Sequence, residues 1–92
     1  MLSPYQKLED KLPAEAMQLV QPLLTRYPLH LKLSKARTSK AGDYRPPQNG
    51  KGHIISVNHN LPPDAFLLTL LHELAHLYAW EEFGRKERPK YE

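Results

Sequence analysis

The residues best suited to chemistry are two histidines and a glutamate in the run His72-Glu73-Leu74-Ala75-His76. Side chains four residues apart on a helix lie on the same face, because an α-helix has about 3.6 residues per turn. Both imidazoles can therefore bind one metal ion, and Zn²⁺ is the usual occupant of such a pair. Glu73 would then stand beside a water molecule at the metal and could accept its proton. The spacing predicts a metal-dependent hydrolytic site.

A helix over Leu61 to Phe83 is expected to position this motif. Proline is favoured at the first helical position, so Pro62 or Pro63 is expected to open the helix, with Asn60 as its cap. Apolar residues surround the segment on nearly every side, which predicts a helix buried in a core. A membrane span needs about 20 apolar residues with few charges, and the acidic residues of this segment exclude one.

Composition predicts a single small domain over residues 1–92, with 40% hydrophobic and 25% charged residues. The absence of cysteine excludes disulfides and Cys-based zinc sites, so histidine and carboxylate must hold any metal. No basic stretch followed by an apolar one opens the chain, so we expect no signal peptide and a cytoplasmic location. The formal net charge of +3 permits contact with nucleic acid but does not by itself indicate it.

Helices are expected before the sheet. Ser3-Pro4 predicts a short helix to about Lys11, and Pro13 is expected to begin a second helix that Pro28 ends. Pro22 lies within the second helix and predicts a kink. The apolar stripe expected to cover the core consists of Ala16, Leu19, Val20, Leu23, Leu24 and Tyr27.

From Leu29 the hydrophobic period changes to two, which predicts a half-buried strand. A second strand is expected from Tyr44-Arg45 and a third over His53–Asn58, with turn residues between them. The fold class predicted is α+β: N-terminal helices, a small three-stranded antiparallel sheet and a buried metal-bearing helix. This is the layout of a minimal zincin, in which an edge strand can hold an extended peptide.

Four segments carry a resemblance that extends beyond the five-residue motif: Gly42-Asp43-Tyr44-Arg45-Pro46-Pro47, His53–Asn58, Asn60-Leu61 and Ala65–His76. From about Tyr27 to Arg85 the chain resembles the SprT-like domain, a family related to the Spartan proteases that degrade proteins crosslinked to DNA. The resemblance implies a zinc-dependent metallopeptidase acting on protein or peptide substrates, some of them associated with DNA. It also implies that His72 and His76 are zinc ligands and that Glu73 is the catalytic base.

The family's third zinc ligand is a histidine in a downstream His-Gly-x-x-aromatic motif, and no histidine follows His76 in this chain. The run Arg85-Lys86-Glu87-Arg88-Pro89 resembles the basic approach to that motif. We therefore expect residues 1–92 to be one SprT-like domain, either an N-terminal piece of a longer family member or a short homologue with an incomplete site. His53 or His59 could reach the metal only if the fold brings them there.

Other residues suggest contacts with a substrate or with nucleic acid. Tyr44 and Arg45 could line the substrate cleft and steady a carbonyl or oxyanion, with an ordinary exposed edge strand as the alternative. His53 is a further cleft candidate. The positive charges that could contact phosphate, or simply be solvated, are Lys35, Arg37 and Lys40. Two functions therefore compete with the metallopeptidase: a non-catalytic DNA-associated binding module and an inactive, truncated zincin fold.

Overall fold

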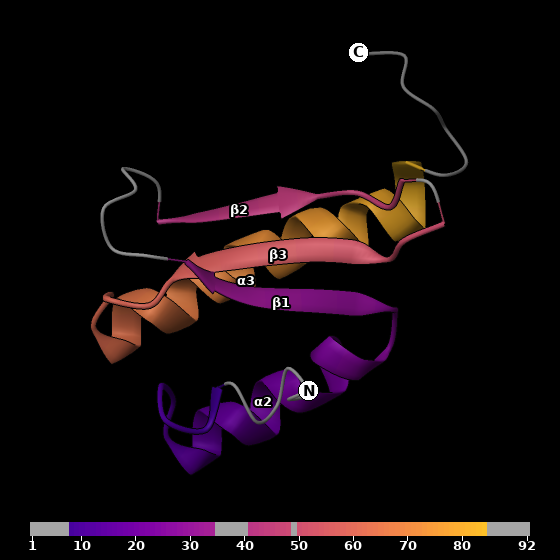
Figure 1. The fold of residues 1–92 in the computed structure, drawn as a ribbon. Coiled ribbons are helices and arrows are strands. Elements are labelled where there is room, and N and C mark those ends of the chain that lie inside the picture. The colour runs from indigo at the N-terminus through magenta and orange to yellow at the C-terminus, as the bar shows by residue number, and fades with distance from the viewer. Residues whose placement is uncertain (1–7, 35–40, 49, 85–92) are drawn as a thin grey trace.

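The structure, a computed structural model, describes residues 8–34, 41–48 and 50–84. Within these residues two helices and three strands form an α+β fold, as predicted (Figure 1). In chain order the elements are α2 (Ala14–Thr25), β1 (Leu29–Ser34), β2 (Gly42–Arg45), β3 (His53–Asn58), α3 (Pro63–Ala79) and the π-helical turn η1 (Trp80–Gly84). Most of the short helix expected from Ser3-Pro4 lies outside the described residues.

The sheet has the strand order β1-β3-β2, so the last strand in the chain lies in the middle. β3 pairs antiparallel with β2, with Tyr44 opposite Ile55, and parallel with β1, with Leu29 opposite His53. The predicted antiparallel sheet is therefore wrong for one of its two strand pairs, and the sheet is mixed. Alternating hydrophobicity marks strands and their faces, but it does not distinguish parallel from antiparallel neighbours when one face is buried.

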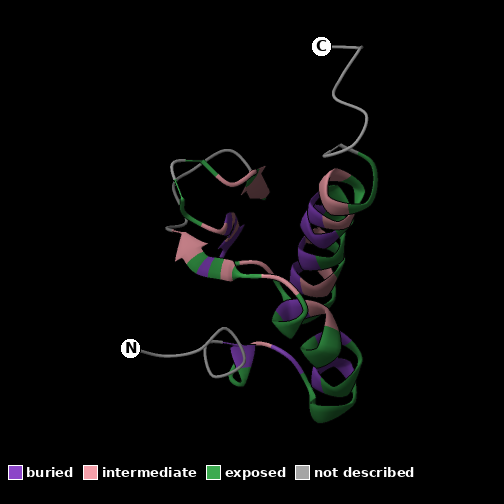
Figure 2. Cartoon of the chain, turned by 90° about the vertical axis from the view of Figure 1, so that its right-hand side faces the viewer, coloured by how far each residue is buried: buried purple, intermediate pink, exposed green. Residues whose placement is uncertain are grey.

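Helix α3 packs against β2 and β3 and also contacts α2 (Figure 1). Its buried residues lie on the side that faces the sheet (Figure 2). The core of the described residues joins apolar side chains from both helices and the sheet: Leu8, Leu12, Ala16, Met17, Val20, Leu24, Leu31, Ile55, Val57, Phe66, Leu70, Leu74 and Leu77. None of the helices that the structure describes has the length and apolar character that a membrane span requires.

The helices differ from the expectations in several details. Helix α3 begins at Pro63, one of the two prolines expected to open it, but its N-cap residue is Pro62 and not Asn60, whose N–H donates to the side chain of Asn58 in the preceding turn. Helix α3 is buried on one side only, because its outer side faces solvent and exposes Leu68. Helix α2 ends at Thr25, and Leu19, expected in its core stripe, is 72% exposed.

Candidate metal centre

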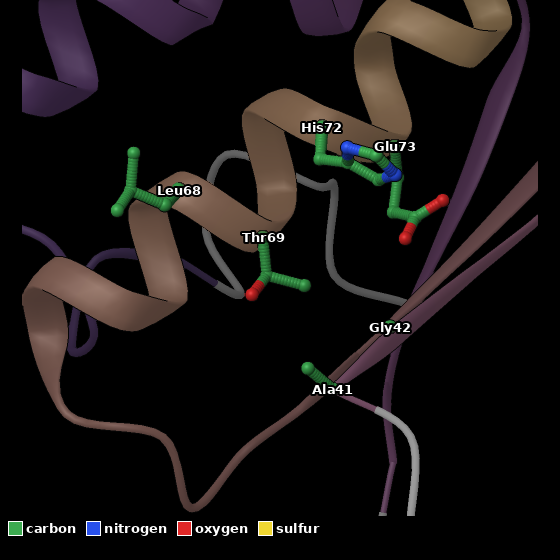
Figure 3. A pocket seen from close by; sticks show the side chains of 6 residues that line it. All are labelled: Ala41, Gly42, Leu68, Thr69, His72 and Glu73. Atoms are coloured by element: carbon green, nitrogen blue, oxygen red, sulfur yellow. The ribbon is translucent and has the colours of Figure 1, made fainter.

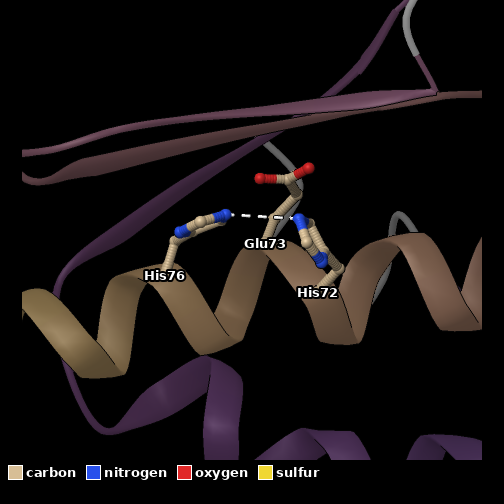
Figure 4. Close-up of side chains that lie close together, drawn as sticks. All are labelled: His72, Glu73 and His76. Atoms are coloured by element: carbon tan, nitrogen blue, oxygen red, sulfur yellow. Dashed lines mark hydrogen bonds between the residues drawn. The ribbon is translucent and has the colours of Figure 1, made fainter.

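The two histidines of α3 point their rings toward each other. The Nε2 atoms of His72 and His76 lie 3.2 Å apart, and the two rings meet edge to face with centroids 4.8 Å apart (Figure 4). Both side chains are exposed, so a ligand can reach them from solvent. This convergence is what the helical spacing of four residues predicts.

The separation of the two nitrogens fits a metal ion held between them. Zinc binds imidazole nitrogen at about 2.0–2.1 Å in tetrahedral geometry, which puts two such ligands about 3.3–3.4 Å apart. The observed 3.2 Å is close to that distance. One ligand atom from each of His72, Glu73 and His76 lies within 4.8 Å of the others, so this group can hold a metal ion.

Glu73 lies on the buried side of α3, against β2. Its side chain is only 7% exposed. A Cβ atom on Gly42 would lie 3.2 Å from Glu73 Oε2 and 2.6 Å from the Thr69 methyl carbon Cγ2. Because Gly42 has no side chain, strand and helix can approach this closely and leave room beside the carboxylate.

A cavity of about 350 Å³ opens beside His72 and Glu73 (Figure 3). Its other walls come from β2 and the residue before it, Ala41 and Gly42, and from the helix positions Leu68 and Thr69. A proton acceptor and an imidazole thus border a cavity whose remaining walls are mostly apolar. The arrangement leaves space for a ligand next to the group that can hold a metal ion.

Tyr44 and His53, two of the cleft candidates, lie together, and Tyr44 lies beside His76. The Tyr44 ring lies almost parallel to the His76 ring, with centroids 6.1 Å apart and an angle of 9°. The Tyr44 hydroxyl is 2.8 Å from Nδ1 of His53. Burial, and then the negative charge of Glu81, raise the pKa of Tyr44 well above its ordinary value, so the phenol keeps its proton to a higher pH than a solvent-exposed tyrosine does.

Arg45, the third cleft candidate, points away from this cluster, because successive residues of a strand face opposite sides. Its guanidinium Nε lies 3.2 Å from Asp43 Oδ2, and the residue lines a different cavity of about 220 Å³ together with Lys51. The nucleic-acid candidates Lys35, Arg37 and Lys40 lie outside the described residues, so contact with DNA stays a prediction.

The described residues supply two imidazoles to the metal-binding group but no third histidine. Neither His53 nor His59 belongs to the group. His53 is buried, and both of its ring nitrogens have hydrogen-bond partners within the fold. Glu73 is the third member of the group, and the group contains no further ligand residue in the part of the chain that the structure describes.

Glu81 is a site residue that sequence reasoning missed. Its Oε2 atom lies 2.7 Å from His53 Nε2. The residue belongs to η1, the π-helical turn that continues α3. A π-helical turn is wider than an α-helical turn and often marks a functional site. Continuing the α-helical period through this segment could not reveal the contact, although the adjacent pair Glu81-Glu82 at the helix end was visible in the sequence.

The chain matches no protein-family model, no curated protein and no solved structure. The geometry of the site therefore carries the functional argument.

Proposed function

We propose that the chain is a SprT-like metallopeptidase in which His72 and His76 bind Zn²⁺ and Glu73 is the general base. The observation that carries the proposal is the convergence of two accessible imidazole nitrogens at 3.2 Å, with the Glu73 carboxylate close by. Imidazole nitrogens at this separation suit zinc, whose catalytic sites combine protein ligands with an open position. The zincin-like fold and the family assignment belong to the same proposal.

The chemistry would be hydrolysis of a peptide bond. A bound zinc ion would lower the pKa of a water molecule and polarise the substrate carbonyl. A carboxylate oxygen of Glu73 accepts a proton as the water oxygen bonds to the carbonyl carbon, and then donates it to the departing amine nitrogen as the C–N bond breaks. The close packing of Glu73 against β2 holds this carboxylate in place between the two transfers.

The strand beside the site supports a polypeptide substrate. β2 lies at one edge of the described sheet and packs against α3. An edge strand can form backbone hydrogen bonds with an extended peptide. The adjoining cavity between Gly42 and Leu68 could accept a side chain next to the scissile bond. Substrates associated with DNA remain a proposal that rests on the family resemblance.

The proposal is tested by Glu73→Gln, which keeps the size of the side chain and removes its basicity. We expect hydrolysis of an unfolded protein substrate by the zinc-loaded chain to fall by about 10²–10⁴-fold. Zinc affinity, measured by competition with a chromophoric chelator, should stay close to that of the wild type. The matched control is Glu82→Gln, an exposed glutamate of η1 outside the metal-binding group.

Two results would contradict the proposal. One is full hydrolytic activity in Glu73→Gln, which would exclude Glu73 as the base. The other is zinc affinity that does not change when His72 and His76 are both replaced by alanine, which would exclude the metal site itself.

A further inference from the structure

Three side chains from different elements, Tyr44, His53 and Glu81, are joined by hydrogen bonds close to the candidate metal centre. His53, the first residue of β3, is 1% exposed. It contacts the Tyr44 hydroxyl of β2 through Nδ1 at 2.8 Å and the Glu81 carboxylate of η1 through Nε2 at 2.7 Å. The chain Tyr44–His53–Glu81 therefore ties the sheet to the segment that continues the metal-bearing helix.

The strand register explains why Tyr44 and His53 meet. Tyr44 lies opposite Ile55, and His53 lies two positions away on the same strand. Residues two apart on a strand share a face, and diagonal neighbours across a strand pair are within reach of long or aromatic side chains. His53 and Tyr44 are thus directed to the face of the sheet that α3 covers.

The chemistry of the three groups assigns the donor and the acceptor of each hydrogen bond. A carboxylate can only accept, so His53 donates from Nε2 to Glu81. In a neutral imidazole Nδ1 is then the acceptor, and we assign the Tyr44 hydroxyl as its donor. The donor role of His53 Nε2 toward Glu81 thus sets the acceptor role of Nδ1 toward Tyr44, and hydrogen bonds in such a buried network polarise one another.

Tyr44 lies at one end of this hydrogen-bonded series. Its ring stacks on His76, one of the two proposed metal ligands, whose Nε2 converges with that of His72. On its other sides His53 contacts Trp80, with ring centroids 5.6 Å apart at 85°, and Tyr27, with centroids 6.3 Å apart. Packing against these two rings restricts rotation of the His53 imidazole. The hydrogen bond from the Tyr44 hydroxyl to this imidazole therefore restricts Tyr44 as well.

We propose that His53 is a positioning residue that, through Tyr44, holds the His76 ring in its metal-binding orientation. The inference rests on the metal site proposed above. Metal-binding histidines depend on partners that orient their rings, and removal of such a partner commonly costs 10–100-fold in metal affinity. Here an aromatic ring, itself held by a buried hydrogen bond, acts as the partner of His76.

The test separates the ring of Tyr44 from its hydroxyl and the charge of Glu81 from its hydrogen bond. Zinc affinity is measured by chelator competition for Tyr44→Phe, Tyr44→Leu, His53→Phe, Glu81→Gln and Glu81→Leu. We expect the losses to be about 10–100-fold for Tyr44→Leu and His53→Phe and smaller for Tyr44→Phe, which keeps the ring. Glu81→Gln should rescue the affinity that Glu81→Leu loses, because its side-chain oxygen still accepts from His53.

The matched control is Glu82→Leu on the same turn. Glu82 accepts a hydrogen bond from the Tyr27 hydroxyl at 2.9 Å, so the substitution removes a carboxylate hydrogen bond of the same kind and keeps the side chains of Tyr44, His53 and Glu81. It should lower stability slightly and leave zinc affinity unchanged. Urea unfolding of every variant shows whether it is folded. If His53→Phe does not fold, the zinc affinities of Glu81→Gln and Glu81→Leu test the positioning role instead.

A second measurement needs no metal. In the metal-free protein, nuclear Overhauser contacts between the His72 and His76 ring protons should weaken in Tyr44→Leu and Glu81→Leu but persist in Glu82→Leu. Wild-type zinc affinity in folded Tyr44→Leu and Glu81→Leu would overturn the inference. Should the wild type itself not bind zinc, the proposed function fails, and the ring contacts alone support or overturn the positioning role.

Discussion

At the scale of single residues, Glu73 and its neighbouring histidines have different surroundings although they share one helix. His72 and His76 face solvent, whereas Glu73 packs against Gly42 of β2. Consecutive residues of an α-helix point about 100° apart, so one helix can present two imidazoles to solvent and a carboxylate to the sheet. The sheet therefore packs directly against Glu73, whereas the two imidazoles stay accessible.

Gly42 offers a direct test of this close packing. Gly42→Ala places a methyl group 2.6 Å from Thr69 Cγ2 and 3.1 Å from the Ser56 carbonyl oxygen, so strand or helix must shift. We expect a loss of about 1–3 kcal/mol in the free energy of unfolding, measured in urea. The reduced entropy of the unfolded chain offsets only about 0.4–1 kcal/mol of it.

A double-mutant cycle provides the control for Gly42→Ala. Thr69→Ser removes Cγ2 and keeps the hydroxyl, so it should recover part of the lost stability when combined with Gly42→Ala. Simple additivity of the two substitutions would show that this contact is not the cause.

Tyr44 should make stability depend on alkaline pH. Burial, and then the charge of Glu81, raise the pKa of Tyr44 above its ordinary 10.0. The folded protein thus holds this proton more tightly than the unfolded chain does. The resulting stabilisation is complete below about pH 10 and is lost as the pH rises through the folded pKa. Urea unfolding should show a steeper decline above about pH 10 for the wild type than for Tyr44→Phe, and parallel declines would refute this.

At the scale of elements, η1 decides where the acidic residues after α3 point. Glu81 reaches His53, and Glu82 reaches the hydroxyl of Tyr27. The two neighbouring carboxylates therefore connect α3 to the start of β3 and to the segment between α2 and β1. A regular helix was the expectation for this stretch, and both contacts come from the π-helical turn found in its place.

Local patterns predicted most of the elements and the convergence of two imidazoles on one face of α3. The third strand was expected over His53–Asn58 and has those bounds, and the convergence of His72 with His76 follows from helical spacing. The roles of Gly42 and Glu81 could not be predicted, because each depends on which elements pack together. The exposure of Leu19 has the same cause: a helix shows several apolar positions, and its neighbours determine which of them are buried.

Helix α2 carries one buried and one exposed leucine, so the contribution of burial to stability can be measured on a single helix. Leu24 is 3% exposed and Leu19 is 72% exposed, on the same helix. Leu24→Ala should lower the free energy of unfolding by about 2–5 kcal/mol because it leaves a cavity in the core. Leu19→Ala should change it by no more than about 0.5 kcal/mol. Equal losses by urea unfolding would mean that α2 packs through a different face.

At the scale of the whole molecule, metal binding would be linked to folding, because the nitrogens of His72 and His76 converge only in the folded helix. A ligand at about 100 times its dissociation constant adds about 2.7 kcal/mol to stability. For a domain of this size that corresponds to a rise in Tm of roughly 10–20 °C. We expect this rise on adding Zn²⁺ to the wild type, measured by thermal unfolding. The His72→Ala, His76→Ala double variant should show none, and an equal rise there would place the zinc elsewhere.

The position of β3 also has a consequence for folding kinetics. β3 follows β1 and β2 in the chain yet lies between them, so neither earlier strand has its sheet partner until β3 arrives. The parallel pairing also requires closure of the long segment between Leu29 and His53, an entropic cost that slows such contacts. We therefore expect the insertion of β3 between the two earlier strands to limit the rate of folding, and the same event brings His53 to Tyr44.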